Sequence, residues 1–182
     1  EISGNCLLKR HGKVIGKNRS FLNMSDKAVH EKLFSVIAHL YELGIRYIKN
    51  DYNHSMGIGC ENYGGSYAEG LIKNTYAFYS FIDEVKEKFP ELIIENCGSG
   101  AMRCDLGTLS HFNLQSISDQ EDYINNPTII QGISACIPPE KCGIWVSPYP
   151  VSYGEQGISK EDYDEKYGGI MEDGNQTVYN MC

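Results

Sequence analysis

The chain has 182 residues, of which 41% are hydrophobic, and it carries 16 Lys and Arg against 24 Asp and Glu, a formal net charge of −8. This length and composition are typical of a single globular domain and exclude global disorder. The acidic balance argues against nucleic acid or an anionic membrane as a partner, because both attract basic surfaces.

Seven cysteines form an odd set without a CxxC pair. A chain of this size does not depend on disulfides, and the spacing fits no zinc motif. We therefore expect mostly free thiols and a cytoplasmic, reducing location. We expect no membrane span and no signal peptide, since no apolar run is long enough. The chain starts at Glu1 and a helix-like pattern is cut at Cys182, which indicates one domain, residues 1–182, incomplete at both ends.

The first predicted elements are a loop, a helix and a strand. The basic stretch 9–19 contains Gly12 and Gly16 and predicts a loop with a solvated face. Asp26 is a suitable helix cap, Gly44 a suitable stop, and apolar residues recur between them at helical spacing. They are Val29, Leu33, Val36, Ile37 and Leu40. A strand follows over 45–51.

A glycine-rich segment, 54–67, separates this strand from a second helix, 67–88, which Pro90 ends. A loop of this length is usually functional, and a plain surface excursion is the alternative. In the helix, the residues predicted to face inward are Leu71, Phe78, Ile82, Val85 and Phe89.

The remaining predicted elements continue the alternation of strand and helix. They are a strand at 92–97, a helix at 102–109, a strand at 112–119, a helix at 121–136 interrupted by Pro127, and a strand at 143–147. Such alternation implies parallel strands joined by right-handed crossovers. The fold class is therefore α/β, and four strands make about half of a (β/α)₈ barrel. A small doubly wound sheet competes, but no glycine-rich nucleotide fingerprint follows a strand.

Polar residues gather where the predicted strands end. Lys49, Asp51 and Asn53 alternate along one strand end and so point the same way. Parallel strands would bring Asp51, Cys97 and Asp119 to one rim, where α/β barrels and sheets carry their chemistry. A solvated strand end with a salt bridge is the alternative interpretation.

Two carboxylates at one rim suit glycoside hydrolysis, in which one stays ionised and the other supplies a proton. Carboxyl groups roughly 5–5.5 Å apart predict retention of configuration, and about 6.5–9.5 Å predicts inversion. Lys49 would favour the ionised form of Asp51, as a nucleophile requires. A metal site at Asp51, Asn53 and His54 matches no common ligand spacing.

Three segments resemble one family in the same order and at similar spacing. Residues 47–53, YIKNDYN, resemble the YIKWDMN strand of glycoside hydrolase family 36, the bacterial α-galactosidases. Residues 95–107, ENCGSGAMRCDLG, resemble its ENCGSGGMRMD-type segment, and 115–123, QSISDQEDY, its S-D-Q/N-x-D segment. Weaker similarity extends from about Cys6 to Cys182.

The resemblance implies a role for each residue that matches a motif. Asp51 would be the nucleophile and Asp119 the general acid/base. Sugar hydroxyls would be contacted by Lys49, Asn53, Cys97, Gly98 and Gly100. Arg103 and Asp105 would support the site from behind. No metal or cofactor is implied.

The implied fold is a partial (β/α)₈ TIM barrel, about strands 3/4 to 7 with their helices. The implied function is a retaining exo-α-galactosidase acting on melibiose- or raffinose-type α-galactoside oligosaccharides. Two alternatives stay open: α-N-acetylgalactosaminidase or galactosyl transferase activity of the same family, and a catalytically incompetent fragment. Such a fragment would self-associate through its open sheet edges, so we expect a homo-oligomer.

Asn50 and Ala101 depart from the family's pattern. Asn50 stands where Trp is usual, and it should affect packing more than chemistry because it points away from Asp51. Ala101 stands where Gly is common, and it would crowd the sugar if the backbone there needs a glycine conformation. Trp145 and most of the tyrosines are expected in the core or barrel shell and not against substrate.

Overall fold

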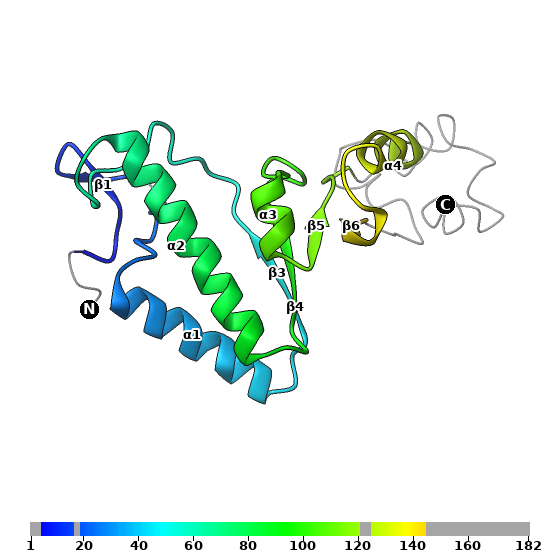
Figure 1. Ribbon diagram of the computed structural model, residues 1–182, viewed down its shortest axis with the longest axis horizontal. Coiled ribbons are helices and arrows are strands. Elements are labelled where there is room, and N and C mark those ends of the chain that lie inside the picture. Colours follow the sequence, from blue (N-terminus) through cyan, green and yellow to red (C-terminus); the bar gives the residue numbers. More distant parts are fainter. Residues whose placement is uncertain (1–4, 17–18, 121–124, 145–182) are drawn as a thin grey trace, which may run out of the picture. The chain divides into compact units, whose positions relative to one another are not determined.

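A computed structural model describes residues 5–16, 19–120 and 125–144 (Figure 1). The chain divides into two compact units, each built from three segments. The first comprises 1–49, 53–94 and 110–112, and the second 50–52, 95–109 and 113–182. The start of the predicted helix at 121–136, Trp145 with the rest of the strand predicted at 143–147, and everything after them lie outside the described residues.

Two long helices dominate the first unit, and both were predicted. Helix α1 (Lys27–Glu42) begins after Asp26, whose carboxylate accepts hydrogen bonds from the N–H groups of Ala28 and Val29. Helix α2 (Tyr67–Lys88) begins after Ser66, whose hydroxyl accepts from the N–H of Glu69 at 3.1 Å. These caps satisfy N–H groups that the helices leave free.

The core of the first unit lies between these helices and the strand segments that adjoin them. Its buried side chains are Cys6, Met24, Val29, Phe81, Ile82, Val85, Phe89, Leu92, Ile94 and Phe112. The inward face predicted for α2 is confirmed, because Ile82, Val85 and Phe89 are buried. On α1 one residue of the apolar pattern does not face the core, since Val36 is 43% exposed.

The predicted loop at 9–19 was wrong over its first part, which forms a hairpin. Strands β1 (Lys9–Arg10) and β2 (Lys13–Val14) pair antiparallel around a two-residue turn. Both turn residues have positive φ, 52° at His11 and 70° at Gly12, as a type I′ turn requires. Lysine and arginine occupy three of the four strand positions, without the apolar alternation that marks a strand, so the sequence pattern missed the hairpin.

The hairpin also fixes part of the glycine-rich segment 54–67. The guanidinium of Arg10 donates to the carbonyls of Met56 and Gly59. Glu61 closes a second contact, because its N–H donates to the carbonyl of Lys9 and its carboxylate accepts from the N–H of Gly12. Backbone groups that a long loop would otherwise expose are thus paired.

The main sheet has the order β3-β4-β5-β6 (Figure 1). Its strands are β3 (Tyr47–Asp51), β4 (Ile93–Cys97), β5 (Leu114–Ser116) and β6 (Cys142–Gly143). β4 pairs parallel with β5, and β5 with β6. Helix α2 precedes β4, α3 (Leu106–His111) precedes β5 and α4 (Asn126–Ser134) precedes β6, so the predicted alternation is confirmed.

The later elements are shorter than predicted. Helix α3 starts at Leu106 and not at Met102, because turns occupy the residues between it and β4. Pro127 does not interrupt a helix, since it lies in the first turn of α4, where its missing N–H costs no hydrogen bond. A short 3-10 helix, Pro139–Lys141, leads into β6.

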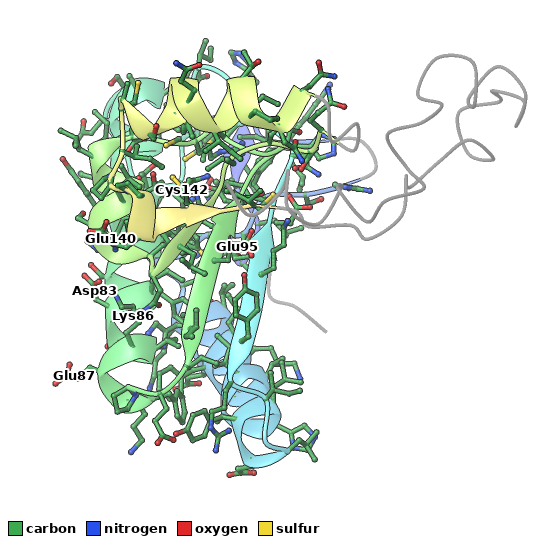
Figure 2. The ribbon with its side chains drawn as sticks, turned by 90° about the vertical axis from the view of Figure 1, so that its right-hand side faces the viewer. Asp83, Lys86, Glu87, Glu95, Glu140 and Cys142 are labelled. Carbon is green, nitrogen blue, oxygen red and sulfur yellow. The ribbon has the colours of Figure 1, made fainter. Side chains whose placement is uncertain are left out.

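Residues 110–112 join the first unit through contacts with α2. Lys86 and Asp83 extend from that helix (Figure 2) and both bind His111. The ammonium of Lys86 donates to the His111 carbonyl at 2.7 Å, and the carboxylate of Asp83 lies 2.9 Å from the imidazole Nδ1. The next residue, Phe112, is 1% exposed and packs against Phe78.

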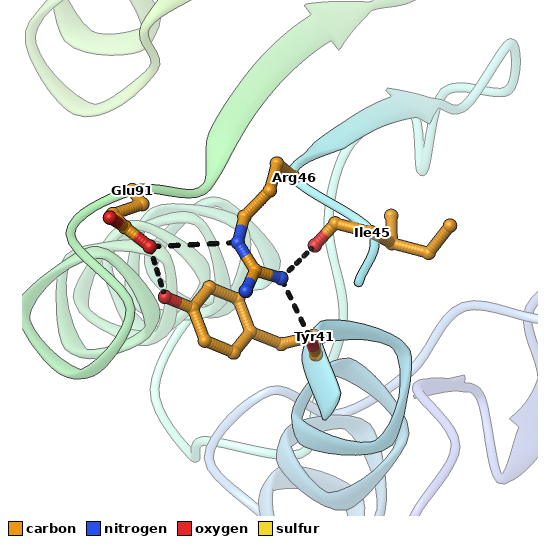
Figure 3. A network of polar contacts seen from close by, with 4 residues as sticks. All are labelled: Tyr41, Ile45, Arg46 and Glu91. Atoms are coloured by element: carbon orange, nitrogen blue, oxygen red, sulfur yellow. Dashed lines mark hydrogen bonds and ion pairs between the residues drawn. The ribbon is translucent and has the colours of Figure 1, made fainter. Parts of the chain in front are cut away.

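A polar network fastens the beginning of the β3 segment (Figure 3). The guanidinium of Arg46 stacks over the ring of Tyr41 at 3.7 Å and donates to the carbonyls of Tyr41 and Ile45. The carboxylate of Glu91 accepts from the Tyr41 hydroxyl at 3.0 Å and lies 3.6 Å from Arg46 Nε. This hydrogen bond to an anion raises the pKa of Tyr41 above its ordinary value.

Candidate active site

Asp51 and Cys97 are direct neighbours at the ends of β3 and β4. The N–H of Tyr52 donates to the carbonyl of Cys97 at 3.1 Å, and in a parallel pair this bond places Asp51 opposite Cys97. Asp51 is exposed, whereas Cys97 is buried. The predicted meeting of these two residues at one sheet edge is therefore what the structure shows.

Asp119 lies near the same edge, because the turn that follows β4 packs against its backbone. Gly98 N–H donates to Gly100 O at 3.1 Å, and Gly100 has φ 69°. A Cβ built on Gly100 would lie 2.7 Å from Ser118 Cα and 3.0 Å from Asp119 N. The turn therefore rests directly on the backbone that carries Asp119, whose side chain is exposed.

Arg103 holds the residue that follows Asp51. Its Nη1 donates to the carbonyl of Tyr52 at 2.5 Å, and its Cζ lies 3.9 Å from the centre of the Tyr52 ring. A Cβ on Gly98 would come within 2.4 Å of the same Nη1. Burial raises the pKa of Tyr52, while the Arg103 charge lowers it and Asp105 raises it.

Asp105 fixes the segment from which Arg103 extends. Its carboxylate accepts from the N–H of Thr108 at 2.9 Å, at the start of α3. The hydroxyl of Thr108 in turn donates to the carbonyl of Arg103 at 2.7 Å. These contacts hold Arg103 and Asp105 on the segment that follows Gly98 and Gly100.

The stacked arginines of the two units provide a test of this support. We expect Arg103→Met to lower the free energy of unfolding by about 2 kcal/mol, because a part-buried charged hydrogen bond to Tyr52 is lost. Arg46→Met removes a similar stacked arginine, but 44% of that side chain is exposed, so we expect less than about 1 kcal/mol. Urea denaturation measures both. Equal losses would contradict a special role for Arg103.

The positions of Lys49 and Asn53, two further predicted site residues, follow from their places in the sequence next to Asp51. Lys49 precedes Asp51 by two positions on β3, and Asn53 follows it by two; both belong to the first unit. Ala101 is absent from the described residues with positive φ, so its backbone does not need a glycine. Among the described residues, no group of three His, Cys, Asp or Glu side chains is arranged to hold a metal ion.

Glu95 is a buried carboxylate that the sequence analysis did not single out as a site residue. It lies on β4 (Figure 2), two positions before Cys97, so both side chains leave the strand on the same face. Glu95 is 7% exposed, and a Cβ on Gly143 would lie 3.4 Å from its Oε1. The available signal was an acid directly after the apolar pair Ile93–Ile94 in a predicted strand.

These features define the class of the protein: an α/β domain that carries acidic side chains at the C-terminal ends of parallel strands. The family model described as Melibiase matches residues 7–161. The chain therefore belongs to the melibiase family. This confirms the family predicted from the three motifs.

Curated relatives agree with this assignment. The chain is 30% identical to α-galactosidase 2 of Pediococcus pentosaceus over 130 residues, which are 69% of this chain and 18% of that protein. It is also 30% identical to the bifunctional α-galactosidase/sucrose kinase AgaSK of Mediterraneibacter gnavus, over 75% of this chain and 14% of that protein. The chain thus spans less than a fifth of either relative.

Solved structures confirm a partial (β/α)₈ barrel. The family 36 α-galactosidase AgaA of Geobacillus stearothermophilus superposes with a TM-score of 0.71 at 21% identity, covering 97% of this chain and 28% of that one. The galactosidase domain of AgaSK gives 0.69 at 23% identity, covering 97% and 26%. Variants of AgaA were solved in complex with raffinose and with stachyose.

No helix in the described part of the chain combines the length and apolar character that crossing a membrane requires. All six cysteines in that part, from Cys6 to Cys142, are free thiols, as expected for them.

Proposed function

We propose that the chain supplies the catalytic carboxylates of a retaining exo-α-galactosidase, with Asp51 as nucleophile and Asp119 as general acid/base. The observation that carries this proposal is the single edge formed by Asp51, Cys97 and the Gly98–Gly100 turn against the backbone of Asp119. Glycoside hydrolysis requires two carboxyl groups, and the chain has one at or just after the end of each of two strands.

The proposed reaction has two displacements at the anomeric carbon. First, an Asp51 oxygen bonds to C1 of the terminal α-galactosyl unit while the bond from C1 to the leaving oxygen breaks and that oxygen takes the proton of Asp119. Second, ionised Asp119 takes a proton from water, the water oxygen bonds to C1, and the ester bond to Asp51 breaks. Two inversions return the α configuration, and Asp119 regains its proton.

The proposed substrates are α-galactoside oligosaccharides of the melibiose and raffinose type. Related family 36 structures contain raffinose and stachyose, and curated relatives are named α-galactosidases, which supports this choice. We propose that Lys49, Asn53, Cys97, Gly98 and Gly100 contact the galactosyl hydroxyls. Lys49 and Asn53 flank the proposed nucleophile in the chain, and the other three follow the neighbouring strand.

A second candidate concerns the 182-residue chain by itself. Its described residues contribute four strands of an eight-stranded fold, and β3 is the first strand in the sheet order. We propose that the isolated chain pairs such edges with further copies and lacks turnover. Light scattering checks this, and a monodisperse monomer would contradict it.

We also propose a reducing, cytoplasmic location. The free thiols in the described part of the chain support this proposal.

The function is tested by turnover of 4-nitrophenyl α-galactoside, with the α-glucoside and the α-N-acetylgalactosaminide as controls. The chain and the longest gene product that contains it are assayed side by side. We expect selective galactoside cleavage by the longer product and, by proton NMR, α-galactose as the first anomer formed. First release of β-galactose would overturn the retaining mechanism, and equal turnover of the glucoside would overturn the substrate class.

A further inference from the structure

A row of amide side chains crosses the face of the sheet opposite to Asp51 and Cys97. Asn50 and Asn96 each precede one of these residues, and successive strand residues point to opposite faces. Because Asp51 lies beside Cys97, Asn50 lies beside Asn96. The register of the next pair places Gln115 beside Asn96. Three neighbouring strands therefore present Asn, Asn and Gln in one line.

The second half of this row is already a chain of hydrogen bonds with one direction. Asn96 Nδ2 donates to Gln115 Oε1 at 2.7 Å and to the carbonyl of Arg103 at 3.2 Å. Gln115 Nε2 donates to the carbonyl of Ser116 at 2.9 Å and reaches that of Gly100 at 3.4 Å. The row thus ends on the turn that rests against Asp119.

The orientation of the Asn96 amide is fixed by these partners. The carbonyl of Arg103 can only accept a hydrogen bond. A flipped Asn96 amide would therefore bring Asn96 Oδ1 next to this carbonyl oxygen, and no hydrogen bond could form. Asn96 Oδ1 must therefore point away from Gln115 and Arg103. Asn96 is fully buried, and its Oδ1 has no hydrogen-bond partner.

The atom that complements Asn96 Oδ1 belongs to Asn50. Within the described residues, only two buried side-chain nitrogen or oxygen atoms lack a partner, Asn50 Nδ2 and Asn96 Oδ1. One is a donor, the other an acceptor, and their residues are lateral neighbours. A buried polar group without a partner is costly, and asparagines in register on parallel strands form amide ladders.

We propose that Asn50 Nδ2 donates to Asn96 Oδ1 and completes an amide ladder, Asn50–Asn96–Gln115–Gly100, that positions the two carboxylates of the proposed reaction. The bond requires a rotation of the Asn50 amide, after which each amide donates to the next in the same direction. Asn50 is covalently joined to Asp51, and Gly100 contacts the backbone of Asp119. The ladder therefore acts as a spacer behind the site, and its catalytic role rests on the proposed function.

This inference gives position 50 a specific role. It is a position where the chain departs from the motif that it resembles. A side chain without a hydrogen-bond donor at this position could not satisfy Asn96 Oδ1. We therefore assign Asn50 as a positioning residue, since it acts through Asn96 and not on the sugar.

The first test observes the hydrogen bond by NMR of the ¹⁵N-labelled chain. The Asn50 side-chain amide is assigned by its loss in Asn50→Asp. We expect at least about tenfold slower proton exchange than for exposed Asn5. Asn96→Leu, which removes the acceptor, should abolish this protection. Gln115→Met breaks the ladder on the other side of Asn96 and should leave the protection of the Asn50 amide unchanged. Equal exchange of Asn50 and Asn5 in the wild type would overturn the ladder.

The second test measures positioning in the active gene product. Asn50→Asp should lower kcat about tenfold with little change in KM, because misplaced catalytic groups slow the bond-breaking step. Asn50→Gln keeps the donor and should recover most of the rate. Val85→Ala, in the core of α2, serves as a destabilised control with unchanged kcat. An unchanged kcat in Asn50→Asp would overturn the positioning role. If the wild type cleaves no galactoside, the proposed function fails and the NMR result still decides the ladder.

Discussion

Replacing Asp51 with alanine is expected to reduce turnover of an aryl α-galactoside by about 10⁴-fold or more, because no group remains to form the galactosyl ester. Asp119→Ala should reduce it by about 10²- to 10⁴-fold, the range of a lost general acid/base. The loss in Asp119→Ala should be smaller for a 2,4-dinitrophenyl galactoside, whose leaving oxygen needs no proton. Activity that survives Asp51→Ala would refute the nucleophile assignment.

Azide separates the two roles by the product that it forms. In Asp119→Ala, azide can attack C1 of the galactosyl ester on Asp51, so two inversions give α-galactosyl azide. In Asp51→Ala, azide can only attack C1 of the substrate directly, so one inversion gives β-galactosyl azide. NMR of the isolated azides identifies the anomers. The opposite pairing of variant and anomer would exchange the roles of Asp51 and Asp119.

Gly100→Ala is expected to lower the free energy of unfolding by about 3 kcal/mol. A positive φ costs an alanine about 1 kcal/mol, and crowding in a packed region adds about 1–3 kcal/mol. Here the new methyl group would lie 2.7 Å from Ser118 Cα, a backbone atom that cannot move without displacing Asp119. We therefore expect Gly100→Ala to lower galactoside turnover as well as the free energy of unfolding.

Gly44→Ala is the matched control for this prediction. Gly44 also has a positive φ, 94°, but a Cβ there meets no atom within 4 Å. We expect a loss of only about 1 kcal/mol, from φ strain alone, and unchanged kcat. Thermal denaturation and turnover of both variants check the pair. If the two variants lose the same stability, the close approach of Gly100 to Ser118 has no energetic weight.

The long helices and the two longer strands could be predicted because each carries its own pattern. The spacing of Ile82, Val85 and Phe89, with Pro90 at the end, predicted α2 with the observed bounds. The predicted strands at 45–51 and 92–97 placed Asp51 and Cys97 at strand ends. Local signals of this kind do not require knowledge of the neighbouring strands.

Features that depend on register or on distant partners could not be predicted in this way. The ladder joins Asn50, Asn96 and Gln115, and nothing in the sequence states that β3 and β4 align these residues. The stacking of Arg103 on Tyr52 likewise joins residues 51 positions apart. The β1–β2 hairpin was missed because its charged residues lack a periodic apolar pattern.

The interleaving of the two units bears on synthesis. The first unit is completed by residues 110–112, after most of the first 94 residues and a segment, 95–109, that belongs to the second. Phe112 fills the core beside Phe78, so a nascent chain that ends before it leaves that core open. Folding on the ribosome therefore cannot complete the first unit until residues 110–112 have emerged. The emergence of Phe112 from the exit tunnel sets the earliest point at which the core of the first unit can close.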